Sequence, residues 1–87
     1  MSYQFPIFRR YKHGNTFYRI NSVENFDELM IIGMYFVFTN HQANILPEYQ
    51  MIIDLLDNAG NRLENIDVEV FEAKLDFCKK NLKEKKF

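Results

Sequence analysis

The chain has 87 residues and a mass of 10.5 kDa, which is the size of one small domain. Apolar residues make up 47%, aromatic residues 16% and charged residues 26%, a composition that excludes an intrinsically disordered chain. The net charge of −1 excludes binding to nucleic acid or membrane that is driven by bulk charge. The charge is nevertheless uneven, because residues 1–23 carry +4, residues 24–78 carry −9 and residues 79–87 carry +4.

A single cysteine, Cys78, limits the chemistry of the chain. It can form neither an intramolecular disulfide nor a cysteine-based zinc site, so a disulfide-stapled secreted scaffold is excluded and a reducing, cytoplasmic location is expected. The first residues lack a basic segment followed by an apolar one, so we expect no signal peptide. The longest apolar run, 30–38, is less than half of the roughly twenty residues needed to span a bilayer, so we expect no membrane partner.

Five residue types, Phe, Tyr, Ile, Asn and Lys, make up 38 of the 87 residues. All five have AT-rich codons, and the bias therefore indicates a bacterial or phage genome. We accordingly give the abundance of Asn and Lys no functional meaning.

Aromatic and β-branched residues on both sides of a Gly-Asn turn predict a β-hairpin over residues 7–20. The turn lies within residues 13–15. A two-residue turn sets Arg10 opposite Arg19, and a three-residue turn sets Arg9 there. Like charges directly opposed on a sheet cost up to about 1 kcal/mol unless an anion lies between them. The hairpin therefore needs a counter-charge, either from an internal acid or from a ligand.

Cations and aromatic rings alternate along this hairpin, which is the composition of a surface that tracks phosphates and stacks bases. The candidate binding residues are Arg9, Arg10, Tyr11, Lys12, Tyr18 and Arg19. In the competing interpretation, which we favour, acids elsewhere in the chain neutralise the arginines and the rings form the core face of the sheet.

The segment after the hairpin predicts a short helix and then a central strand. Asn21 or Ser22 is a suitable N-cap, and apolar residues at spacings of three and four indicate a helix over 22–30. The run 30–38 is apolar without alternation, which is typical of a strand covered on both faces. A turn over 40–44 is expected to follow.

Two interpretations compete for residues 45–60. Pro47 suits the first helical position, apolar residues between Tyr49 and Leu56 follow a helical spacing, and Gly60 can end a helix. These features favour a helix.

An internal similarity supports a strand for the same segment. The residues after Gly14 and those after Gly60 share a Gly-Asn pair, a strand ending in Ile, an Asn or Asp cap, and Val-Glu-x-Phe-acid. A ββα-like pseudo-repeat of 7–30 and 51–82 would make 51–57 the first strand of a second hairpin. We prefer the helix, because a strand-cap-helix join recurs often without common origin.

The last predicted helix, capped by Asp67, is apolar on two faces. One stripe consists of Val68, Phe71, Leu75, Cys78 and Leu82. The opposite side carries Val70, Ala73 and Phe77. A chain this small has few helices and strands that could cover both faces. The second face is therefore a candidate surface for a protein partner or a homodimer.

Together these elements predict a small single α+β domain over residues 1–87. An antiparallel sheet of about four strands would carry two or three helices, packed mainly on one face.

The chain offers little catalytic chemistry. Cys78 falls within the apolar stripe, where a thiol packs well and reacts poorly. His13 and His41 each lie in a predicted turn, where we expect them to be exposed, and neither has a partner at metal-ligand spacing. No pair of carboxylates has the contrasting environments of acid–base catalysis, and the glycines are too far apart for a phosphate-binding loop. The sequence therefore predicts no enzyme, no cofactor and no metal site.

These observations favour a small intracellular, non-enzymatic protein-binding module that acts stoichiometrically, as an adaptor, a subunit or an inhibitor. A compact chain with AT-rich codons also suits a phage-type inhibitor of a host enzyme. The alternative is an RNA or single-stranded nucleic-acid binder that uses the hairpin 7–20.

Overall fold

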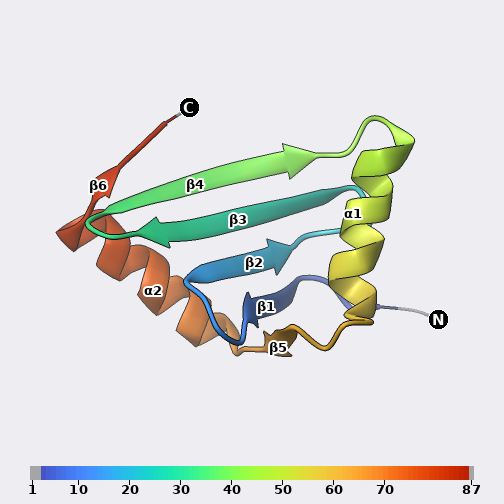
Figure 1. The fold of residues 1–87 in the computed structure, drawn as a ribbon, viewed down its shortest axis with the longest axis horizontal. Coiled ribbons are helices and arrows are strands. Elements are labelled where there is room, and N and C mark those ends of the chain that lie inside the picture. The colour runs from blue at the N-terminus through green and yellow to red at the C-terminus, as the bar shows by residue number, and fades with distance from the viewer. Residues whose placement is uncertain (1–2, 87) are drawn as a thin grey trace.

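Four consecutive strands form an antiparallel meander at the centre of the structure, a computed structural model that describes residues 3–86. The strands are β1 (Ile7–Tyr11), β2 (Thr16–Ile20), β3 (Asn25–Ile32) and β4 (Tyr35–Gln42), each paired with the next (Figure 1). The hairpin predicted over residues 7–20 is therefore confirmed, as β1 and β2.

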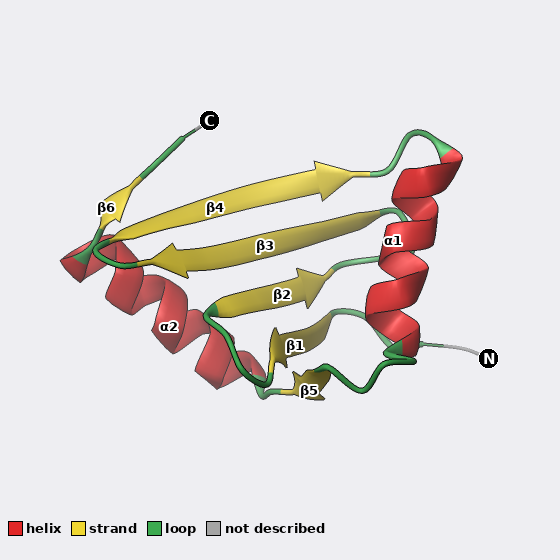
Figure 2. Ribbon diagram, in the orientation of Figure 1, coloured by secondary structure: helices red, strands yellow, loops and turns green. Residues whose placement is uncertain are grey.

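The rest of the chain winds around this meander. Helix α1 (Leu46–Asp57) leads from β4 to β5 (Leu63–Asn65), which pairs antiparallel with β1. Helix α2 (Val68–Asn81) returns to the other edge, where β6 (Lys83–Glu84) pairs parallel with β4. The sheet thus has six strands in the order β5-β1-β2-β3-β4-β6 (Figure 2). The α+β class is confirmed, whereas the prediction of about four antiparallel strands missed β5 and the parallel strand β6.

The two helices cover opposite faces of the sheet. Phe17 and Tyr18 are consecutive on β2 and therefore point to opposite sides. Tyr18 packs in a core cluster with residues of α1, and Phe17 in a second cluster with residues of α2. We call these sides the α1 face and the α2 face. The prediction that the helices pack mainly on one face is wrong, because one helix crosses each side of the sheet as the chain moves from edge to edge.

Each face has its own small core. The buried residues of the α1 face are Tyr18, Ile20, Phe26, Ala43, Ile52, Leu55, Leu56 and Leu63. Those of the α2 face are Phe17, Leu29, Phe36, Phe71 and Cys78. The sheet is therefore stabilised by apolar burial on both sides, and its central strands need apolar residues in both directions.

Helix α1 confirms the interpretation that we preferred for residues 45–60. Pro47 lies at its start, where a missing N–H removes no helical hydrogen bond. The helix ends at Asn58, which has a φ of 51° in the left-handed region, so Gly60 is not its terminator. Because 51–57 is helical, it is not the first strand of a second hairpin, and the ββα-like pseudo-repeat is wrong at that point.

The short helix predicted over 22–30 is wrong, because residues 25–30 belong to strand β3. The apolar run 30–38 is also not one strand. A two-residue turn at Gly33 and Met34 divides it between β3 and β4, and Gly33 has the positive φ, +60°, that a type II′ hairpin turn requires at its first position. Strand β4 then continues into the turn that was predicted over 40–44.

Helix α2 lies where the sequence places it. Asp67 is its N-cap residue, and Phe71 and Cys78 of the predicted stripe are fully buried. Leu75 and Leu82 pack against the same cluster. Neither helix in residues 3–86 combines the length and the apolar character that crossing a membrane would require.

Candidate functional site

The register of the first hairpin separates its arginines. Phe8 lies opposite Arg19, and Arg10 lies opposite Phe17. Both registers predicted from the sequence, with Arg9 or Arg10 opposite Arg19, are therefore wrong. The physical reason is the length of the loop, which has four residues between β1 and β2 instead of two or three. Apolar and aromatic partners lie opposite the arginines, so no like-charge repulsion has to be relieved by a ligand.

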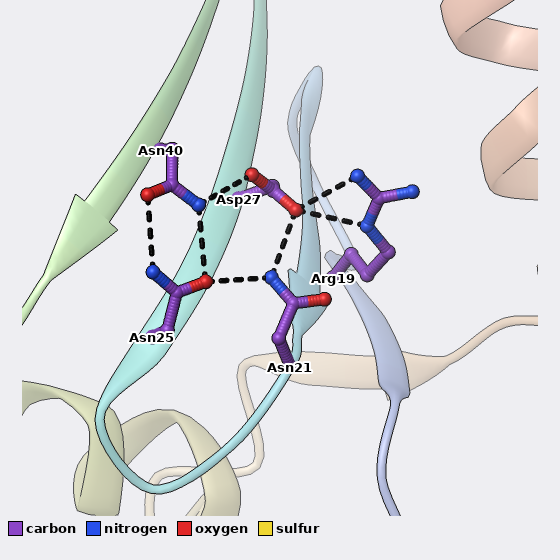
Figure 3. Close-up of polar contacts among 5 residues, drawn as sticks. All are labelled: Arg19, Asn21, Asn25, Asp27 and Asn40. Atoms are coloured by element: carbon purple, nitrogen blue, oxygen red, sulfur yellow. Dashed lines mark hydrogen bonds and ion pairs between the residues drawn. The ribbon is translucent and has the colours of Figure 1, made fainter.

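An internal acid neutralises Arg19. Asp27 is its direct neighbour on β3, and the Nε and Nη2 of Arg19 lie 2.9 and 2.8 Å from one carboxylate oxygen, Oδ2 (Figure 3). The guanidinium also lies 5.4 Å from the centre of the Phe71 ring on α2. Arg19 is thereby held between the sheet and the start of α2.

Three asparagines complete the shell around Asp27, which is 5% exposed. Asn21 donates to Oδ2 at 2.9 Å and Asn40 donates to Oδ1 at 2.9 Å. Asn25 connects the two, because it accepts from Asn21 at 2.8 Å and exchanges hydrogen bonds of 3.0 Å with Asn40 (Figure 3). Burial disfavours the charged carboxylate, but the donors from Asn21, Asn40 and Arg19 outweigh it and hold the pKa of Asp27 below its usual value.

The six candidate residues of the basic hairpin do not form one surface. Arg10 is on the α2 face and makes an ion pair with Glu64 of β5. Tyr18 is on the α1 face and is only 4% exposed, and burial followed by the negative charge of Glu28 raises the pKa of its phenol. Arg9 shares that face, and its Nε is buried without a hydrogen-bond partner within residues 3–86. The structure therefore brings Arg10 and Arg19 to acids and removes Tyr18 from solvent.

The two histidines differ in their environments. His13 lies in the exposed loop between β1 and β2, as predicted. His41 lies in strand β4 and not in a turn, so that prediction is wrong. Its ring stacks on Phe26 with 4.5 Å between ring centres, and its Nε2 lies 3.1 Å from Oε1 of Glu28.

A hollow of about 230 Å³ adjoins His41, with Glu48 of α1 also in its wall. The wall thus contains the imidazole of His41 and the carboxylate of Glu48, two groups that can transfer protons. The hollow is lined by Phe26, Asn40, His41, Gln42, Ala43, Glu48, Met51 and Ile52. None of these residues has the hydroxyl or thiol of a nucleophile that the imidazole could activate.

Cys78 is fully buried in the α2 core, as the sequence predicts. Burial raises the pKa of its thiol above the usual value, and the positive charge of Lys74 only partly opposes this. No group of three or more His, Cys, Asp or Glu side chains in the described part of the chain is arranged to hold a metal ion.

The outer side of α2 carries an exposed apolar surface, which we call the α2 patch. It consists of Val70, Ala73 and Phe77, of which Val70 is 42% and Phe77 51% exposed. The ammonium of Lys74 lies 5.9 Å from the centre of the Phe77 ring and forms part of its polar border. The second apolar face predicted for this helix is therefore present and exposed to solvent.

Sequence reasoning missed two further exposed features. The β3–β4 turn projects Ile32 and Met34, which are 54% and 75% exposed. Beyond this turn, β4 after Phe36 has no neighbouring strand on the side away from β3 within the described part of the chain. Gly33 is the one sequence signal that could have located this hairpin, because an isolated glycine within an apolar run can mark a turn.

Comparison with protein-family models, curated proteins and solved structures found no match for this chain.

Proposed function

We propose that this protein is a stoichiometric protein-binding module, an adaptor, subunit or inhibitor, whose α2 patch contacts a partner protein. The observation that supports the proposal is the exposure of Phe77, of which 51% is accessible to solvent. Exposed apolar patches with a polar border mark sites of protein interaction, and aromatic residues are enriched in such interfaces.

The surroundings of the patch have the composition of an interface rim. Lys74 and Lys80 lie within one helical turn of Phe77, and Asn81 follows at a spacing of four. An apolar centre with polar residues around it is typical of interfaces that form between separately stable proteins.

The positions of the reactive groups support a role without catalysis. The thiol of Cys78 is buried, and the hollow beside His41 has no hydroxyl or thiol among the described residues of its wall. The cytoplasmic location and the bacterial or phage origin remain predictions from the sequence. The nucleic-acid alternative is less favoured, because Tyr18 is buried and Arg10 and Arg19 are paired with acids.

Affinity capture with a photocrosslinker at position 70 tests the proposal. The protein, expressed in cells of its source organism, is irradiated, and crosslinked partners are identified by mass spectrometry. We expect a partner that Phe77→Asp releases and that Ile53→Asp retains, because Ile53 is 48% exposed on the other helix and provides a matched control. A partner that binds both variants equally would show that the α2 patch is not the contact surface.

A further inference from the structure

The outer edge of β4 is only partly covered. Strand β6 pairs with Tyr35 and Phe36, and the amide of Lys85 donates to the carbonyl of Phe36 at 2.8 Å. Figure 1 shows the C-terminal segment leaving β4 beyond this point. The rest of the strand, up to Gln42, has no neighbouring strand on that side within residues 3–86.

The hydrogen-bonding groups on this edge can be assigned from alternation along the strand. The carbonyl of Phe36 points towards β6, and the amide of Ala43 points the other way, to the carbonyl of Glu24 at 2.7 Å. Even-numbered residues of β4 therefore direct their backbone groups outwards. Phe38 and Asn40 each present an N–H and a C=O, and Gln42 presents its N–H, while its carbonyl accepts from the Asn44 side chain at 3.3 Å.

This edge lacks the features that prevent strands from pairing. Strand β4 contains no Asp, Glu, Lys, Arg, Pro or Gly. Exposed edges in soluble proteins are usually protected by an inward-pointing charge, a proline, a bulge or a short strand. Here the protection extends over the two residues covered by β6. The free stretch is thus competent to accept another strand.

There is space for such a strand beside it. A hollow of about 440 Å³ is lined on one side by residues 37–40 and on the other by residues 84–86. The hollow lies where the C-terminal segment separates from β4.

We propose that β4 of a second copy of this chain occupies this edge, so that two molecules form an antiparallel dimer with a continuous sheet. The free stretch from Phe38 to Gln42 is centred on Asn40, so a two-fold axis there aligns Asn40 with its counterpart. Phe38 of each copy then pairs with Gln42 of the other. Each outward N–H of one copy then faces an outward carbonyl of the other. The carbonyl of Gln42 differs from the others, because it already accepts a hydrogen bond from the Asn44 side chain.

The charges and the other sheet edge both favour a second copy over other occupants. The strand contains no Asp, Glu, Lys or Arg, so the paired stretches bring no such charges together. Glu84 lies beside Phe36, so Lys86 is level with about residue 38 of its own β4 and its counterpart with about residue 42. The two basic segments at residues 83–86 therefore end about four residues apart along the shared edge, or roughly 13 Å. That separation exceeds the screening length of about 8 Å at physiological salt. The opposite edge, β5, has only three residues and cannot pair with the whole stretch. A contact of β4 with β4 is therefore the one that closes as a dimer.

Substitution of Gln42 tests the backbone contact itself. Gln42→Pro removes the outward N–H, and Gln42→Ala removes the same side chain but keeps that N–H. In sedimentation at rising concentration, we expect the native chain and Gln42→Ala to form dimers and Gln42→Pro to dimerise at least about tenfold more weakly, because the dimer loses two symmetry-related hydrogen bonds. Circular dichroism of each variant checks that it is folded.

A cysteine at the proposed axis provides a second readout. Opposite residues that exchange both backbone hydrogen bonds in an antiparallel pair have Cα atoms about 5.5 Å apart. A disulfide can bridge this distance. We expect Asn40→Cys to form a disulfide-linked dimer under mild oxidation much faster than Val23→Cys, a control thiol in the loop between β2 and β3 that is 49% exposed before substitution.

Three results would overturn the proposal. They are a native chain that stays monomeric at the highest concentration, equal dimerisation of the Pro and Ala variants, and equal crosslinking of the two cysteine variants. Phe77→Asp separates this dimer from the partner surface on α2. It should leave the dimer intact, whereas dissociation by Phe77→Asp alone would place the dimer contact on the α2 patch.

Discussion

Arg19 and Asp27 lie directly opposite each other on β2 and β3, with 2.8 Å between Nη2 and Oδ2. Asp27 is the one charged residue that the fold buries among residues 3–86, and its two oxygens accept hydrogen bonds from three different residues. The positive charge of the hairpin is thus met by an acid of the adjacent strand. The same contact links β2, β3 and, through Asn40, β4.

Asp27→Asn is expected to destabilise the protein by about 1–3 kcal/mol, because it keeps the shape of the side chain but removes the charge that holds Arg19. Urea unfolding measures the loss. The control is Asp76→Asn, which breaks the ion pair with Lys80, where the side chains are 61% and 71% exposed. That variant should lose less than about 0.5 kcal/mol. Equal losses would contradict a special role for the buried carboxylate.

The same carboxylate should make stability depend on pH in the acid range. The pKa of Asp27 is lowered on folding from an ordinary value of 3.8, so its contribution is fully present above that value and disappears as the pH falls towards the folded pKa. We expect the difference in unfolding free energy between the native chain and Asp27→Asn to shrink below about pH 5. Urea titrations across this range measure it. A difference that stays constant down to the acid unfolding region would refute the lowered pKa.

The sequence predicted those elements whose signals are local. The stripe that includes Phe71 and Cys78 repeats at helical spacing over the whole of α2, and the aromatic residues around Gly14 identify the first hairpin. The register of that hairpin could not be predicted, because it depends on the length of the loop between the strands. Loops that differ by one residue suit this sequence equally well, and each gives a different register.

The second hairpin was missed because the sheet is covered on both faces. Phe26 points to the α1 face and Leu29 to the α2 face, and both are buried. A strand with apolar residues in both directions loses the alternation that identifies a strand, and the remaining spacing imitates a helix. The Asp27 cluster was missed for a related reason, since Asn21 and Asn40 meet Asp27 only once strand pairing is known.

Cys78 is expected to react slowly with thiol reagents in the native protein, since the side chain is fully buried and burial raises the pKa of the thiol. The Val23→Cys variant contains both thiols and provides an internal control. Its reaction with a chromogenic disulfide should show two phases of equal amplitude, and the slower phase, from Cys78, should be at least about a hundredfold slower. Urea should merge the phases. A single fast phase in the native state would contradict the buried position of Cys78.

Binding of single-stranded RNA is expected to be weak, because Tyr11 is the only one of the two candidate tyrosines that is exposed, at 37%, and two of the four cations of the hairpin are paired. Tyr18 is buried, and Arg10 and Arg19 contact Glu64 and Asp27. Titration with fluorescently labelled RNA at two salt concentrations measures both the affinity and the number of phosphate contacts, since each contact contributes a slope of about −0.7 in the logarithmic plot. We expect a slope close to zero and no change on Lys12→Ala. Tight binding that weakens steeply with salt and with Lys12→Ala would establish the hairpin as a nucleic-acid surface and remove the argument for a protein-binding role.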